Sequence, residues 1–389
     1  MWEFTGPRTI IFGKESLEYL KEIKGERALV ITDKVIRRLG FVDKIANYLR
    51  EGGISIRVFD EVEPDPSTET VSKAARIAMD YNPDWIVALG GGSSIDVAKA
   101  TWVLYERPDI KVDEISPLVD LGLRKKARLI CIPTTSGSGS DASWAIVVTN
   151  TKEQRKMELA SKEIFADICI LEPQLTSTMP PELIADTGID ALANGIEAYV
   201  SQWRNDFSDA LSIKAIQLVF EYLPKAYKNP QDEIAREKMQ NAATMAGLAF
   251  SNSQLGVVHA TAHAIGGLFK IPHGRAIATV LPWVMEYNAM EAMERYAEIA
   301  KAIGIQARTQ RQAVENLIKA TRKLIEEMGE PASIEEMGMS WEEYKKSLEK
   351  LVERAMESTG TIADPRAPSK EDFRRLFTYA FKGRRVDLQ

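Results

Sequence analysis

WIVALGGGSSID, residues 85–96, joins an apolar run, a triple glycine and the start of a helical segment. A glycine turn between a strand and a helix lets the backbone approach a pyrophosphate, and the helix N-terminus offers N–H donors and the positive end of its dipole. The spacing is not G-x-G-x-x-G, and a triple glycine can also be a tight turn and nothing more. The segment therefore predicts a strand, a turn and a helix, with a candidate phosphate site at the turn.

Strand-like and helix-like segments alternate on either side of this turn. Other apolar, strand-like runs occupy residues 27–32, 55–62 and 127–135, and amphipathic segments occupy 35–50, 68–81 and 94–105. Near-continuous apolar strands that alternate with helices indicate a parallel sheet covered on both faces. We therefore expect a Rossmann-like α/β domain over residues 1–180, which is a nucleotide-binding architecture by default, although a fold alone does not establish a function.

The character of the chain changes after Met179-Pro180-Pro181. Helical spacing then dominates, and strand-like runs no longer interrupt it; the predicted helices cover 182–201, 208–227, 232–250, 283–303, 309–328, 341–356 and 370–381. We expect residues 181–389 to form an all-helical second domain.

The composition excludes several classes of function. The formal net charge is −6 and no Lys/Arg-rich face stands out, which argues against a nucleic-acid partner. The N-terminus lacks a signal-peptide pattern, and no window reaches about 18 consecutive apolar residues, so we expect no membrane association and a cytoplasmic location. Cys131 and Cys169 lie in apolar strand-like runs, where buried, inert thiols are expected.

All three histidines of the chain lie in GVVHATAHAIGGLFKIPHG, residues 256–274. His259 and His263 are four residues apart and project from one face of a helix. His273 follows in a segment with glycine and proline, predicted as a loop that can fold back towards that helix. Imidazoles grouped in this way indicate a transition-metal site, which needs at least one more ligand.

A candidate ligand lies upstream in TGIDALANGIEAY, residues 187–199. Asp190 is placed among apolar residues at helical spacing, where a carboxylate is costly unless it is paired or bound to a metal. Asn194 follows one turn later on the same face and offers an amide oxygen as a weaker fourth ligand.

Together the patterns G-x-D-A-L…E-A-Y, G-x-V-H-x-x-A-H-x-x-G and P-H-G resemble those of the iron-containing (group III) alcohol dehydrogenase family. The resemblance implies that Asp190, His259 and His273 hold a metal and that His263 lies beside the nicotinamide as a catalytic residue. Asn194 stands where the family usually has a histidine ligand. An Asp/His/His site resembles the zinc site of related glycerol dehydrogenases, so the resemblance implies Fe²⁺ or Zn²⁺.

Two loops resemble the dinucleotide-binding patterns of that family. GGGS-x-x-D is its phosphate loop, here Gly90, Gly91, Gly92, Ser93, Ser94 and Asp96. The run 133–140, PTTSGSGS, resembles a second loop whose dinucleotide contacts would be Thr134, Thr135 and Ser138. Lys156 matches a lysine near the nicotinamide ribose, although an ordinary solvated lysine explains it almost as well.

Asp33 follows the first clear strand, in VITDK. A carboxylate at that position accepts hydrogen bonds from an adenosine ribose and repels a 2′-phosphate. We therefore expect NAD rather than NADP.

The resemblance extends from about Arg8 to Asp372. It implies an alcohol dehydrogenase or aldehyde reductase that transfers a hydride between a primary alcohol and NAD(H) in the cleft between the domains, as a homodimer or higher homo-oligomer. The alternatives are a hydroxyacid-oxoacid transhydrogenase, an NAD/metal enzyme like dehydroquinate synthase, and a non-catalytic dinucleotide-binding protein. A phosphate-bearing substrate would need a basic cluster, and the helices near the candidate metal offer little beyond Arg275.

Overall fold

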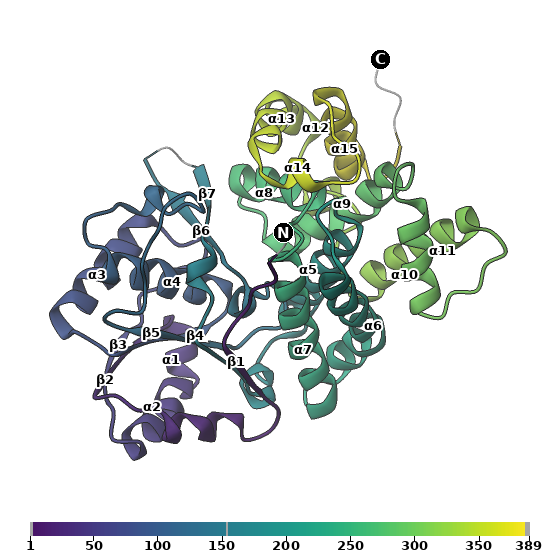
Figure 1. Ribbon diagram of the computed structural model, residues 1–389. Helices are drawn as coiled ribbons and strands as arrows, with labels where there is room; N and C mark the ends of the chain where they lie inside the picture. The colour runs from purple at the N-terminus through teal and green to yellow at the C-terminus, as the bar shows by residue number, and fades with distance from the viewer. Residues whose placement is uncertain (1–2, 153–154, 386–389) are drawn as a thin grey trace. The chain divides into compact units, whose positions relative to one another are not determined.

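The computed structural model describes residues 3–152 and 155–385. The chain divides into two compact units, Met1–Thr178 and Met179–Gln389. The first carries the sheet and the second is helical (Figure 1). This confirms the predicted α/β plus all-helical fold class.

The first unit is built on a six-stranded sheet in which every neighbouring pair is parallel. Its strand order is β1 (Thr9–Phe12), β8 (Ile168–Leu171), β5 (Arg128–Pro133), β4 (Trp85–Gly90), β2 (Arg27–Ile31) and β3 (Ser55–Phe59). Strands β4 and β5 are in register from Trp85↔Arg128 to Gly90↔Pro133. Their carboxyl ends therefore lie side by side, which is where open α/β sheets bind ligands.

Both faces of the sheet are covered, because alternate residues of β2 enter different apolar cores. Leu29 and Ile31 pack with α3 (Thr68–Tyr81) and α4 (Gly92–Glu106), whereas Ala28 and Val30 belong to the core that includes α2 (Phe41–Glu51). The amphipathic segment 35–50 was expected to form one helix, but it forms two, α1 (Lys34–Arg38) and α2. They are separated because Gly40 adopts φ 79° between them.

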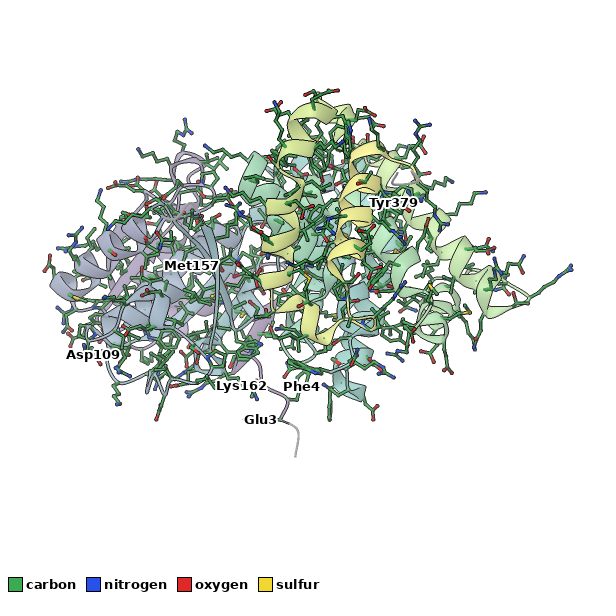
Figure 2. All side chains as sticks on the ribbon, turned by 90° about the horizontal axis from the view of Figure 1, so that it is seen from above. Glu3, Phe4, Asp109, Met157, Lys162 and Tyr379 are labelled. Carbon is green, nitrogen blue, oxygen red and sulfur yellow. The ribbon has the colours of Figure 1, made fainter. Side chains whose placement is uncertain are left out.

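Two features of this unit lie outside the sheet. An antiparallel hairpin, β6 (Ala145–Asn150) and β7 (Arg155–Ala160), follows the second glycine loop. Nζ of Lys162 lies 3.0 Å from Oε2 of Glu3 (Figure 2). This ion pair links the start of the described chain to the segment that follows β7.

The second unit consists of helices around one large core. They are α5 (Pro181–Val200), α6 (Asp206–Lys228), α7 (Glu233–Phe250), α8 (Val257–Phe269), α9 (His273–Asn288), α10 (Met293–Ala302), α11 (Gln310–Glu327), α12 (Trp341–Lys346), α13 (Leu348–Glu357), α14 (Gly360–Ala363) and α15 (Lys370–Lys382). Helix α5 is buried at every residue from Gly188 to Val200. A Cβ at Gly188 would lie 2.2 Å from a methyl of Leu223, so this glycine lets α5 and α6 approach closely.

Three predictions of local structure are wrong here. The predicted helix 283–303 is the end of α9 followed by α10, and the predicted helix 341–356 is α12 and α13 with Ser347 between them. His273 does not lie in a loop, because it is the first residue of α9. Proline favours the first turn of a helix, yet Pro282 lies inside α9, so the helix begins earlier than the local signal indicates. No helix in the described parts of the chain combines the length and apolarity needed to cross a bilayer.

Candidate active site

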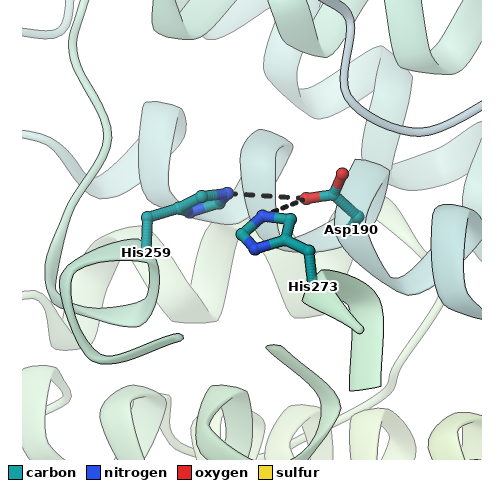
Figure 3. Close-up of side chains that lie close together, drawn as sticks. All are labelled: Asp190, His259 and His273. Atoms are coloured by element: carbon teal, nitrogen blue, oxygen red, sulfur yellow. Dashed lines mark ion pairs between the residues drawn. The ribbon is translucent and has the colours of Figure 1, made fainter. Parts of the chain in front are cut away.

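Asp190, His259 and His273 converge from α5, α8 and α9 (Figure 3). Oδ1 of Asp190 lies 3.5 Å from Nε2 of His259 and 3.6 Å from Nε2 of His273. The three candidate ligand atoms all lie within 4.8 Å of one another. One carboxylate oxygen and two imidazole nitrogens facing a common point form a donor set that suits Zn²⁺ or Fe²⁺.

Close backbone packing brings these helices together. A Cβ on Gly274 would lie 2.2 Å from the carbonyl oxygen of Asp186, so the first turn of α9 packs directly on α5. Asp186 precedes Asp190 by one helical turn, and Gly274 directly follows His273. The contact between Asp186 and Gly274 therefore brings Asp190 and His273 close to each other. Glycine is needed at position 274 because any side chain would separate the two helices.

The cluster perturbs the ionisation of its own members. Burial by itself would lower the pKa of His259, but the carboxylates of Glu197 and Asp190 outweigh burial and raise that pKa to about 10. Burial would raise the pKa of Asp190, but His273 and His259 hold it well below its usual range. Burial lowers the pKa of His273 despite the opposing effect of Asp190. Metal binding needs neutral imidazole, so it would displace the proton that His259 otherwise holds.

Glu197 is a functional candidate that sequence reasoning missed. Its Oε2 pairs with Nδ1 of His259, and its Oε1 accepts a 2.6 Å hydrogen bond from the Val258 N–H. The carboxylate thus holds the imidazole so that Nε2 faces Asp190. The sequence contained a spacing that could have identified it, because Glu197 follows Asp190 by seven residues, which is two turns along one helical face.

His263 and Asn194 border the cluster. The ring centroid of His263 lies 5.8 Å from that of His259 and 5.0 Å from that of His273. Asn194 is buried, and its amide nitrogen lies 3.4 Å from Oδ1 of Asp190. Asn194 therefore presents a donor to the carboxylate, and its role as a fourth ligand through oxygen stays a prediction.

In the α/β unit the two glycine-bearing loops lie next to each other. The Thr134 N–H donates to the carbonyl of Gly90 at 3.0 Å. A Cβ on Gly92 would lie 3.0 Å from Oγ of Ser138, and one on Gly91 would lie 3.4 Å from Thr135. The glycines therefore let the second loop approach the first turn of α4, beside the helix N-terminus that was predicted to bind a phosphate.

Exposure separates the predicted dinucleotide contacts into two groups. Gly90, Ser94, Asp96 and Thr134 are buried, while the partly exposed members of the two loops are Gly91, Gly92, Ser93, Thr135 and Ser138. Both oxygens of Asp96 already have protein partners, the Ser140 hydroxyl at 2.5 Å and the Val147 N–H at 2.9 Å. Asp96 therefore joins the two loops to each other.

Asp33 lies beside the glycine turn, and Lys156 lies on β7. Oδ1 of Asp33 caps α1 by accepting from the N–H groups of Val35 and Ile36, at 2.7 and 2.9 Å. Its Oδ2 lies 3.6 Å from the point where a Cβ on Gly90 would be. Lys156 is paired with Asp65, and its predicted contact with a ribose stays a prediction.

The two cysteines are buried, as predicted. They are register partners on the adjacent strands β5 and β8. Burial raises the pKa of Cys131 to about 12 and that of Cys169 well above its ordinary value. Thiols in this state are inert.

Comparisons with family models and with individual proteins agree with each other. Family models described as iron-containing alcohol dehydrogenase and as the C-terminal part of the Fe-containing alcohol dehydrogenase family match residues 7–173 and 184–381. An NADPH-dependent butanol dehydrogenase of Clostridium saccharobutylicum is 42% identical over 390 residues, covering 100% of both chains.

Two solved structures are similar over nearly the whole chain. A 1,3-propanediol oxidoreductase has a TM-score of 0.92 at 32% identity, covering 98% of this chain and 100% of the other. An iron-containing alcohol dehydrogenase from Thermococcus thioreducens has a TM-score of 0.89 at 35% identity, also covering 98% of this chain and 100% of the other.

Proposed function

This chain belongs to the iron-containing alcohol dehydrogenase family and is an NAD(P)-dependent alcohol dehydrogenase; we propose that Asp190, His259 and His273 are its metal ligands and that uncharged primary alcohols and their aldehydes are its substrates. The single observation that supports this most strongly is the convergence of the three ligand atoms within 4.8 Å of one another.

The residues have distinct roles in this proposal. When bound, a divalent cation supplies a Lewis acid that favours loss of the alcohol proton. Asp190 supplies an anionic ligand, and His259 and His273 supply neutral nitrogen ligands. Glu197 holds Nδ1 of His259, so Nε2 stays directed at the site. His263 has its ring within 6 Å of both ligand imidazoles, and we assign it to accept the alcohol proton and pass it outward.

The charges beside the ligands favour an uncharged substrate. Arg275 is two residues from His273, but its guanidinium is already near two carboxylates, Glu182 at 3.4 Å and Asp186 at 3.7 Å. Because Arg275 already lies near two carboxylates, it is poorly placed to pair with the carboxylate of a hydroxyacid or with a substrate phosphate. This argues against the transhydrogenase and against a reaction like that of dehydroquinate synthase.

We further propose NAD rather than NADP as the coenzyme, and either Fe²⁺ or Zn²⁺ as the metal. Asp33 lies at the carboxyl end of β2 beside Gly90, where its charge would repel a 2′-phosphate. The NADPH dependence of the butanol dehydrogenase from Clostridium saccharobutylicum is a property of that protein. The proposed contacts of the dinucleotide are Gly90, Gly91, Gly92, Ser93, Ser94, Thr134, Thr135 and Ser138. Asp96 would hold the two loops together, and Lys156 would contact the nicotinamide ribose.

We also propose a homodimer or higher homo-oligomer. Strand β1 lies at the edge of the sheet, and Phe12 on it is 64% exposed. An edge strand with an exposed aromatic side chain is suited to pairing with another chain. Light scattering coupled to size-exclusion chromatography measures the oligomeric state, and a monomer would contradict this proposal.

The experiment that tests the function starts from metal-free protein prepared without oxygen. Fe²⁺ or Zn²⁺ is added back, bound metal is measured, and a panel of primary alcohols and aldehydes is assayed with NAD(H) and NADP(H). We expect activity only in the metal-loaded samples, with free coenzyme reduced by an alcohol alone. Turnover that requires an oxo acid would instead favour the transhydrogenase, and metal binding without turnover would favour a non-catalytic protein.

A further inference from the structure

We propose that Asp364, together with Glu197, positions the first turn of α8 and thereby aims His259 into the metal site. The proposal rests on the metal ligands of the proposed function. It assigns to Asp364 a role as a positioning residue, because this side chain acts through the α8 backbone and does not touch the site itself.

Two carboxylates cap the N-terminus of α8. The first N–H groups of a helix lack intrahelical acceptors. Here the Val257 N–H donates to Oδ1 of Asp364 at 2.9 Å, and the Val258 N–H donates to Oε1 of Glu197 at 2.6 Å. Negative charge at a helix N-terminus is favourable because it faces the positive end of the dipole. His259 is the next residue, so the orientation of this turn determines the direction of its ring.

Gly256 makes this arrangement possible. A Cβ at that position would lie 2.4 Å from Oδ1 of Asp364 and 2.9 Å from Oε1 of Glu197. The two carboxylates therefore approach the same point of the backbone from different segments, Glu197 from α5 and Asp364 from the residue after α14. Any side chain at residue 256 would push at least one of them away.

Asp364 also connects the two helices that carry the imidazole ligands. Its Oδ1 accepts a second hydrogen bond, 3.1 Å long, from the amide of Asn288 on α9. Through one oxygen atom, Asp364 thus binds α8 at its start and α9 at its end. The side chain is buried, which makes each of these hydrogen bonds costly to lose.

The two carboxylates have different tasks, which can be separated by substitution. Glu197 is paired with the ring of His259, so its negative charge matters. Asp364 contacts backbone and amide donors, and an uncharged oxygen can accept the two hydrogen bonds that Oδ1 receives from Val257 and Asn288. An amide would lose only the longer 3.4 Å bond from the Arg366 N–H to Oδ2. Burial, then the nearby Glu197, raises the pKa of Asp364 to about 7, which agrees with a position where a neutral acceptor is tolerated. Asp364→Asn should therefore be mild, whereas Asp364→Ala removes the acceptor.

The test measures Zn²⁺ affinity by competition with a chelator, and the ligand-field absorption of the Co²⁺-substituted protein. Outer hydrogen-bond partners typically contribute about 10–100-fold to metal affinity. We expect losses in that range for Glu197→Gln and Asp364→Ala, with a shifted Co²⁺ spectrum, and a change of less than about threefold for Asp364→Asn. Gly256→Ala should reproduce the loss through displacement of both carboxylates.

A cap that lies away from the site provides the matched control. Asp232 caps α7 by accepting from the Ala235 N–H at 2.9 Å. Asp232→Ala should lower the melting temperature and leave Zn²⁺ affinity and the Co²⁺ spectrum unchanged. Wild-type affinity and spectrum in Asp364→Ala would overturn the proposal, and if that variant does not fold, the same result in Gly256→Ala would overturn it. Failure of the wild-type protein to bind Zn²⁺ would instead overturn the ligand assignment.

Discussion

The amide nitrogen of Asn194 lies 3.4 Å from Oδ1 of Asp190, the same oxygen that faces both ligand imidazoles. Asn194 therefore acts on the carboxylate by donating to it, one helical turn along α5. A donor at this position directs the remaining lone pairs of Asp190 towards the cation site.

Asn194→His should convert a three-donor site into a four-donor site. Imidazole is a better ligand than an amide for Fe²⁺ or Zn²⁺, so we expect the metal Kd to fall by about tenfold or more. Asn194→Ala serves as the control, because it removes the amide without adding a ligand. Chelator competition measures both variants. Unchanged metal content and affinity in Asn194→His would show that position 194 does not reach the cation.

His263→Ala should reduce kcat and leave metal affinity unchanged. A positioned proton acceptor typically contributes about 10²–10⁴-fold to the rate, so we expect a loss of about 100-fold at neutral pH. The ring does not belong to the group of three candidate ligands, and bound metal should therefore stay at the wild-type level. Steady-state kinetics on a primary alcohol provides the measurement. A variant with full kcat would remove His263 from the mechanism.

Asp33→Asn should relax the coenzyme preference. An asparagine oxygen can still accept from the N–H groups of Val35 and Ile36, so the cap on α1 is retained while the negative charge is lost. We expect kcat/KM for NADP to rise by about tenfold relative to that for NAD. The values are measured for both coenzymes in both proteins. A wild-type protein that clearly prefers NADP would contradict the assignment of Asp33.

Glu330→Gln should change how stability depends on pH. Burial, with the added effect of Asp186, raises the pKa of Glu330 to about 7 from its ordinary 4.5. Between these values the folded protein keeps a proton that the unfolded chain releases, so stability falls as pH rises through this window. The glutamine variant lacks this loss of stability. At pH 8 we expect its free energy of unfolding to exceed that of the wild type by about 1 kcal/mol, and at pH 5 we expect a smaller difference.

Melting temperatures of both proteins from pH 5 to 8 measure this effect. Glu326→Gln is the control, because that carboxylate is exposed in the last turn of α11, four residues before Glu330. Parallel curves for the wild type and Glu330→Gln would show that Glu330 is not the group whose ionisation destabilises the fold.

Much of the architecture was predictable because it depends on short-range patterns. The apolar run and glycines of residues 85–96 form β4, the turn and α4 as expected. Helix ends were less predictable, since Pro282 continues α9 and Gly40 divides a pattern that looked continuous. At Pro282, which is buried inside α9, packing outweighs the preference of proline for a first turn. At Gly40 the reason is local, because glycine tolerates the positive φ that divides α1 from α2.

The chemistry of the site was predictable only in part. Spacing alone placed His259 and His263 on one helical face, because helical geometry is local. No local rule states that His273 begins a helix whose next residue, Gly274, packs against the backbone of Asp186. The role of Asp96 is similar, since its partners Ser140 and Val147 lie more than forty residues away in the chain.

By itself, the amino-acid sequence determined the alternation of strands and helices, the change to an all-helical second half, and the grouping of its histidines, because hydrophobic period and residue spacing act over one or two turns. Only the tertiary structure decided that Glu197 and Asp364 meet at Gly256, and that Asn194 presents nitrogen to Asp190. Those relationships depend on the close packing of buried helices, where the missing Cβ of one glycine decides which distant side chains touch.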